Sequence, residues 1–167
     1  MLAKWLHIVE KRYGDETTYK KAAAFLDGHG GLEDWGCGTC YARRYFHHSR
    51  YTGVDGSGPF ADIIADLRFY TSRSDCILIR HVLEHNSEWK AILSNAVASF
   101  QNRMVLATFT PFGPTTKNIR INRNGICDIS FRKAELTELL LDYLVDEESL
   151  TTKTEYGSEH LFYLKRP

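Results

Sequence analysis

The sequence has few cysteines, four in 167 residues. A chain of this length cannot be held together by so few, which excludes a disulfide-rich scaffold. Cys76 lies in an apolar run, Cys-Ile-Leu-Ile, and is expected to be a buried free thiol. Cys37 and Cys40 form a Cys-x-x-Cys pair, the spacing of a redox-active dithiol.

The sequence also lacks an excess of charge and any long apolar run. Its 21 Lys and Arg residues balance 21 Asp and Glu residues, so there is no strong nucleic-acid signal and no overall field toward a membrane. No apolar run reaches transmembrane length, and residues 1–10 indicate an amphipathic helix rather than a signal peptide. A cytoplasmic protein is expected, and its oligomeric state stays open.

No repeat, low-complexity tract or linker divides the chain. We therefore expect a single α/β domain over residues 1–167, with an N-terminal helical segment at 1–28 and the core at 29–167. Apolar runs that alternate with helical patterns predict a Rossmann-like, mostly parallel twisted sheet with helices on both faces.

The predicted elements alternate along the chain. The expected strands are 32–35, 51–55, 61–65, 75–80 and 104–108, followed by an antiparallel hairpin of 147–155 and 159–164. The expected helices are 17–26 with Thr17 as N-cap, about 39–47, one capped by Asn86 or Ser87 that runs to Phe100, and one over 136–144. The connection after residue 55 is too short for a full crossover helix, and 109–129 is expected to be an irregular cover over a site.

A glycine-rich turn follows the first strand, in Leu32-Glu-Asp-Trp-Gly-Cys-Gly-Thr-Cys40, and Asp55 stands at the end of the second strand. Glycines let the backbone approach a ligand, and a carboxylate on the next strand can accept both hydroxyls of a ribose. The pair therefore predicts a nucleotide-type cofactor. A dinucleotide is disfavoured, because Tyr41 occupies the position of the third glycine in Gly-x-Gly-x-x-Gly.

A thiol–disulfide protein is a second alternative. Cys37 and Cys40 follow a strand and open a predicted helix, whose N-terminus would lower the pKa of Cys37. The acidic residues around the turn have no role in thiol–disulfide exchange. The close approach of a cofactor to the backbone explains the two glycines better than a redox-active dithiol does.

Taken together, the motifs resemble those of the class I S-adenosylmethionine-dependent methyltransferases, over most of the chain. The matching segments are the Leu32–Thr39 turn, Asp55, Ala65-Asp66-Leu67, and Asp75-Cys-Ile-Leu-Ile-Arg-His-Val-Leu-Glu-His85. The resemblance implies S-adenosyl-L-methionine as the cofactor. It places Asp34 at the amino group of the methionine moiety, Asp55 at the ribose, and Asp66 with Leu67 at the adenine. The full implied set is Asp34, Gly36, Cys37, Gly38, Asp55, Gly56, Asp66, Leu67, Arg80 and His81.

Three residues that leave the fourth strand are candidates for catalysis. Methyl transfer from a sulfonium needs chiefly an in-line arrangement, and a general base only where the acceptor must lose a proton. His81, Glu84 and His85 stand where the acceptor would bind. Glu84 and His85 are better explained as residues that cap or pack the next helix, whereas His81 fits a structural role and a catalytic role equally well. Their spacing matches no known metal ligand set, so no metal is expected.

The acceptor is expected to be a small molecule. The family's members that methylate base amino groups carry Asp/Asn-Pro-Pro-aromatic after the fourth strand, and this chain has Arg80-His-Val-Leu there. A sugar is one such small-molecule acceptor, and a protein or an RNA is a less favoured one. Basic residues in 117–133 would favour an anionic acceptor, although such a run is more often a solvated loop. The alternative is a non-catalytic cofactor-binding subunit of a modifying complex.

Overall fold

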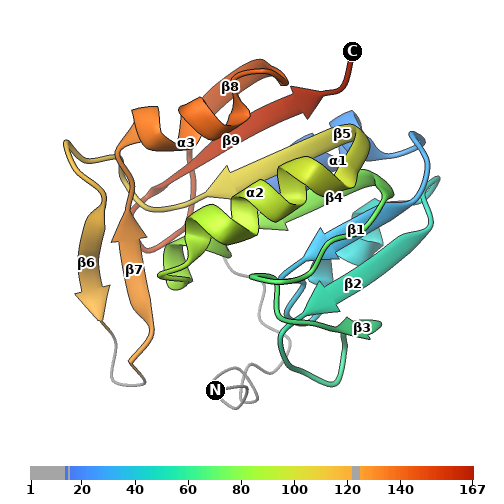
Figure 1. The fold of residues 1–167 in the computed structure, drawn as a ribbon, viewed down its shortest axis with the longest axis horizontal. Coiled ribbons are helices and arrows are strands. Elements are labelled where there is room, and N and C mark those ends of the chain that lie inside the picture. The colour runs from blue at the N-terminus through green and yellow to red at the C-terminus, as the bar shows by residue number, and fades with distance from the viewer. Residues whose placement is uncertain (1–13, 15, 122–124) are drawn as a thin grey trace.

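The computed structural model describes residues 14, 16–121 and 125–167, and the helix expected at 1–10 lies outside them. A seven-stranded sheet with the order β3-β2-β1-β4-β5-β9-β8 forms its centre (Figure 1). Its strands are β1 (Leu32–Trp35), β2 (Tyr51–Asp55), β3 (Ile63–Ile64), β4 (Ser74–Arg80), β5 (Phe100–Thr108), β8 (Leu144–Thr151) and β9 (Ser158–Lys165). The predicted α/β fold, a mostly parallel sheet with an antiparallel C-terminal hairpin, is confirmed.

Strand direction creates one edge at which the predicted site residues can meet. β1 runs parallel to β2 and to β4, and β4 runs parallel to β5. β9 is antiparallel to both β5 and β8. The carboxyl ends of β1, β2, β4 and β5 therefore share an edge with the first residues of β9, and open α/β sheets bind ligands at this edge.

Helices cover both faces of the sheet (Figure 1). α1 (Thr17–Leu26) and the 3-10 helix η2 (Tyr41–Tyr45) lie on one face, and α2 (Trp89–Ser99) and α3 (Lys133–Leu140) lie on the other. The centre of β4, residues 76–79, is continuously apolar because both faces of the strand are covered. Cys76 and Leu78 pack with α1, while Ile77 and Ile79 pack with α2, and all four are fully buried.

The helix expected at 39–47 is wrong in type and length. Cys40 has a φ of 53°, in the left-handed region, so a regular α-helix cannot begin at Thr39. Only the short η2 forms, and Ala42 is its buried residue. The glycine turn is therefore followed by a tight turn rather than by the N-terminus of a long helix.

The segment 109–129 is not irregular throughout, which corrects a second expectation. β6 (Lys117–Ile121) pairs antiparallel with β7 (Cys127–Ser130) in a separate two-stranded sheet. Figure 1 shows this pair standing apart at one end of the molecule. Every residue of β6 is exposed, so the short alternation of Ile119 and Ile121 with polar residues does not mark a face toward the core.

The connection from β2 to β3 contains no helix, as expected: residues 56–62 join the two parallel strands directly. The strand predicted at 61–65 shrinks to Ile63–Ile64. The physical reason is Asp62, whose carboxylate accepts the Gly53 N–H at 2.7 Å and thereby takes a backbone donor of β2.

Several further boundaries differ from the prediction, and β5 begins at Phe100 rather than at residue 104. α1 has Glu16 rather than Thr17 at its N-cap, and α2 has Glu88 there, because a 3-10 helix, η3 (Leu83–His85), occupies the chain just before it. α3 ends at Leu140, which lets β8 start at Leu144.

Candidate functional site

The two glycines of the turn have different surroundings. Both have left-handed backbones, with φ of 76° at Gly36 and 55° at Gly38. A Cβ at Gly36 would lie 2.3 Å from Cγ2 of Val82, so the segment that leaves β4 packs directly on this residue. A Cβ at Gly38 would meet no described atom within 4 Å. Gly36 is therefore required by packing, and Gly38 borders open space that a ligand could enter.

The structure brings Asp55 to the turn. One carboxylate oxygen accepts the Gly38 N–H at 2.9 Å and the other accepts the Ser57 N–H at 3.0 Å. Burial raises the pKa of Asp55, against the effect of these backbone donors. A carboxylate oxygen can accept more than one hydrogen bond, so both oxygens keep capacity for a diol.

Asp34 is a buried carboxyl at the end of β1, with 4% of its surface exposed. It accepts a hydrogen bond from the hydroxyl of Tyr51. Burial raises the pKa of Asp34 to about 7, although Tyr51 and the nearby positive charge of Arg80 act in the opposite direction. A cation brought to this carboxyl would therefore be strongly favoured.

The residues expected beside an adenine lie after β2 and β3. Asp66 is held by Arg68, with Nη2 of the arginine 2.5 Å from Oδ2, and these hydrogen bonds lower the pKa of Asp66. Leu67 is buried in the core. Gly56 has the carbonyl of Ala65 3.7 Å from where its Cβ would be.

The side chain of Arg80 is held in place by hydrogen bonds to other side chains of the protein. Its guanidinium donates to Glu159 Oε1 at 2.8 Å, to Thr18 Oγ1 at 3.1 Å and to the Tyr19 hydroxyl at 2.8 Å. Glu159, at the start of β9, has no exposed surface. Glu159 could not be predicted from the sequence, because only the topology, with β9 beside β5, brings it to β4.

His81 shares the same buried carboxylate. Its Nε2 lies 2.6 Å from Glu159 Oε1, which places the proton on that nitrogen, and its backbone is left-handed with φ of 58°. Burial, with the adjacent charge of Arg80, lowers the pKa of His81 to about 3. The imidazole is therefore neutral at physiological pH.

Glu84 ties two strand ends together. It has no exposed surface, and Oε1 accepts the Phe109 N–H at 2.6 Å. Burial raises the pKa of Glu84 to about 7. Its carboxyl connects the exit of β4 to the exit of β5.

His85 belongs to a different cluster, made with β7 and the β8–β9 turn. Its Nδ1 lies 2.9 Å from the Cys127 carbonyl oxygen and 3.3 Å from Asp128 Oδ1. Asp128 also accepts the hydroxyl of Tyr156 at 2.9 Å. Although burial opposes charging, the carboxylate of Asp128 raises the pKa of His85.

Phe109 joins these groups into an aromatic wall. Its ring centroid lies 4.8 Å from that of His81, 5.5 Å from that of His85 and 5.8 Å from that of Tyr156. Asp128 and Tyr156 had no signal in the sequence. Both depend on the β6–β7 pair and the β8–β9 turn, which bring distant segments to the end of β5.

The pKa of Cys37 in the turn is shifted in the direction opposite to that expected for a redox-active dithiol. A hydrogen bond with Cys40, together with burial, raises the pKa of Cys37, whereas the prediction was a lowered pKa. The missing long helix removes the dipole on which that prediction depended. Cys76 is fully buried and unbonded to another cysteine, as expected.

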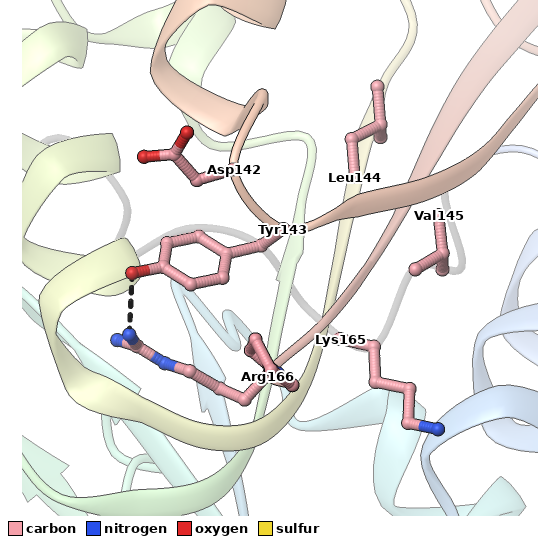
Figure 2. A pocket seen from close by; sticks show the side chains of 7 residues that line it. Asp142, Tyr143, Leu144, Val145, Lys165 and Arg166 are labelled. Carbon is pink, nitrogen blue, oxygen red and sulfur yellow. Dashed lines mark hydrogen bonds between the residues drawn. The ribbon is translucent and has the colours of Figure 1, made fainter.

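A pocket of about 310 Å³ lies where β8 begins and β9 ends, at the other end of the strands from the glycine turn. It is lined by residues 142–145 and 165–167, and Figure 2 shows Arg166 donating to the Tyr143 hydroxyl, at 2.6 Å. Its residues come from the start of β8 and the end of β9, so it has no connection with the predicted cofactor residues. Among residues 14, 16–121 and 125–167, no helix is long and apolar enough to span a membrane. The same residues contain no group of three or more His, Cys, Asp or Glu side chains that could hold a metal ion.

No protein-family model and no curated protein sequence matches the chain. Solved structures do. A 1,6-didemethyltoxoflavin N1-methyltransferase of Burkholderia thailandensis, with its substrate and S-adenosylhomocysteine bound, has a TM-score of 0.71 at 19% identity, over 91% of this chain and 79% of that one. Magnesium protoporphyrin IX methyltransferase of Synechocystis, with S-adenosylhomocysteine, has a TM-score of 0.65 at 16% identity, over 91% and 83%.

The fold is not restricted to methyl transfer among these neighbours. The (4+2)-cyclase SpnF has a TM-score of 0.71 at 13% identity, over 91% of this chain and 81% of that one. At such identities the likeness concerns the fold, and activity has to be argued from the site. The chain has the fold of the class I S-adenosylmethionine-dependent methyltransferases.

Proposed function

We propose that the protein is a cytoplasmic S-adenosyl-L-methionine-dependent methyltransferase that acts on a small molecule. One observation carries the proposal: no described atom lies within 4 Å of where a Cβ of Gly38 would be, while its N–H holds the carboxylate of Asp55 at 2.9 Å. A ligand that enters this space meets a bare backbone and a carboxylate oriented for a diol. The neighbours that bind S-adenosylmethionine or its demethylated product support the choice of cofactor.

The residues of this edge fit that cofactor. Asp55 would accept the ribose hydroxyls, and Asp34 would face the ammonium of the methionine moiety, since its buried carboxyl gains most from a cation. Cys37 would line the turn beside Gly36 and Gly38. Gly56, Asp66 and Leu67 would border the adenine. Arg80 and His81 would hold the edge of β4 in place through Glu159.

The cofactor supplies a methyl group on a sulfonium, and the chain has to orient the acceptor and remove a proton where one must leave. Of the three candidate residues, His85 suits the base best. Although burial opposes charging, the carboxylate of Asp128 raises the pKa of His85, and 17% of its side chain is exposed, so the imidazole can accept a proton. Glu84 is fully buried against Phe109, and His81 already donates from Nε2 to Glu159. We assign these two a structural role.

The acceptor would lie against the wall of Phe109 and Tyr156. An anionic acceptor has less support, because two basic residues of the neighbouring segment already form ion pairs, Arg120 with Glu155 at 2.6 Å and Lys133 with Glu147. A small acceptor with an apolar ring suits the aromatic wall better.

Calorimetry with S-adenosylhomocysteine tests the cofactor assignment. Gly38→Ala should fold normally and lose at least about tenfold in affinity, because the new methyl group fills the space above the turn. Gly28→Ala is the matched control. It has a similar φ of 80° and its nearest neighbour is 3.8 Å away, so it carries the same backbone strain far from the turn. Equal affinity in both variants, or no binding to the wild type, contradicts the proposal.

Turnover is tested with radiolabelled methyl donor and fractionated small-molecule pools. His85→Gln should abolish most methyl transfer and leave S-adenosylhomocysteine affinity unchanged. Tight cofactor binding without consumption of the donor in any pool would instead favour the non-catalytic subunit, or a reaction of another kind, as the cyclase neighbour shows for this fold.

A further inference from the structure

Two thiols lie against each other inside the glycine turn. Sγ of Cys40 is 3.2 Å from Sγ of Cys37 and 3.1 Å from the carbonyl oxygen of Phe60. The backbone between the cysteines closes a tight turn, in which the Cys40 N–H donates to the Cys37 carbonyl at 2.8 Å. Cys40 is also one of two described non-glycine residues with a left-handed backbone. The turn therefore holds the sulfur atoms side by side.

The neighbouring strand provides room for this pair. Gly53 in β2 has no side chain, and a Cβ there would lie 2.5 Å from Sγ of Cys40 and 2.8 Å from Sγ of Cys37. A Cβ atom is essentially never found so close to other atoms, so any larger residue at this position would push the sulfurs away. Gly53 thus forms a recess that both sulfur atoms fill.

We propose that Cys37 and Cys40 are a peroxide-sensitive modification site, and that a disulfide between them weakens cofactor binding at the glycine turn. The second part of the inference rests on the proposed function. A disulfide needs its sulfurs about 2.05 Å apart, so each must move toward the other from the present separation of 3.2 Å. Gly38 lies between the two cysteines, and its N–H holds Asp55. The movement therefore displaces the same backbone that borders the cofactor space.

The chemistry balances with hydrogen peroxide as the oxidant. The thiol of Cys37 stabilises the thiolate of Cys40 by a hydrogen bond, which lowers the pKa of Cys40. The Cys40 sulfur attacks one peroxide oxygen: an S–O bond forms, the O–O bond breaks, and hydroxide leaves and is protonated to water. The Cys37 thiol then attacks this sulfur, the S–S bond forms, and a second water leaves. The two thiols lose two electrons and two protons, and the peroxide gains both.

The test uses the full chain, with S-adenosylhomocysteine as the probe. The reduced protein is titrated by calorimetry, treated with hydrogen peroxide, titrated again, and finally reduced with dithiothreitol. We expect free thiols in the denatured protein to fall from four to two. The dissociation constant should rise at least about tenfold and return after reduction. Reversal by dithiothreitol separates the dithiol from oxidation of methionine.

Two variants locate the effect. Cys40→Ser, whatever its own affinity, should show the same dissociation constant before and after peroxide. Cys127→Ser, which changes a free cysteine of β7 and leaves the dithiol intact, should respond as the wild type does.

Each contrary result contradicts a different part of the inference. Four remaining thiols after peroxide would refute the modification site. A disulfide with unchanged affinity would refute the control of binding, as would a Cys40→Ser variant that still responds. A reduced protein that does not bind S-adenosylhomocysteine refutes the proposed function and the control of binding, while the thiol count still decides the modification site by itself.

Discussion

Replacing Glu84 with glutamine should stabilise the protein, and only at neutral and alkaline pH. The carboxyl is fully buried, Oε1 accepts the Phe109 N–H, and Oε2 has no hydrogen-bond partner in the described part of the chain. Glutamine keeps an oxygen acceptor for the Phe109 N–H and carries no charge. The variant therefore removes the cost of ionising a buried group and keeps the connection between β4 and β5.

The magnitude follows from the pKa of Glu84, which rises from the ordinary 4.5 to about 7 on folding. Because the folded state holds its proton longer, the unfolded state ionises first, and wild-type stability falls as pH rises from about 4.5 to about 7. At about 1.4 kcal/mol per pKa unit, the loss reaches about 3 kcal/mol at pH 8. The glutamine amide gains two N–H donors without a clear acceptor, which costs about 1–3 kcal/mol, but equally at every pH.

Urea unfolding at several pH values measures the effect. The stability of Glu84→Gln relative to wild type should increase by about 3 kcal/mol between pH 4.5 and pH 8. Glu138→Gln, at an exposed position of α3, is the control and should show little change with pH. A difference that stays constant across this range would refute the reasoning, because it would mean that Glu84 is ionised in the folded state as it is in the unfolded chain.

Three other predictions follow from the site. Affinity for S-adenosylhomocysteine should rise between pH 6 and 8 as Asp34 ionises around its pKa of about 7, and calorimetry should find this dependence lost in Asp34→Asn. Gly36→Ala should lower stability by about 1–3 kcal/mol in urea unfolding, because its methyl group collides with Val82 in a left-handed turn. Arg80→Leu should cost about 3–5 kcal/mol by leaving Glu159 buried without its arginine, and the added change Glu159→Gln should restore part of that stability.

The sheet and its main helices were predictable because burial determines their residue types. β4 is covered on both faces, so its central residues 76–79 are all apolar, and α2 buries Trp89, Ile92 and Leu93 at helical spacing. The glycine turn and Asp55 were predictable for another reason. Positive φ and close approach require glycine there, and parallel strands bring the carboxylate to the same edge.

The acceptor side was not predictable from local pattern. β6 buries none of its residues, so its short apolar alternation does not show where it packs, and its partner β7 brings Asp128 to His85. Glu159 reaches Arg80 only because β9 inserts between β5 and β8. Such contacts join residues far apart in the sequence, and a single sequence does not show which of its polar residues will meet.

The left-handed backbone of His81 also bears on attempts to stabilise this protein. Such a conformation costs a non-glycine residue about 1–2 kcal/mol, and glycine would adopt it freely. Replacement by glycine would relieve this strain, but it would also remove the hydrogen bond between the imidazole and the buried carboxylate of Glu159, which costs about 1–3 kcal/mol, and the ring contact with Phe109. The contacts of the His81 side chain therefore offset the strain of its own backbone. Relieving that strain alone would not stabilise the exit of β4.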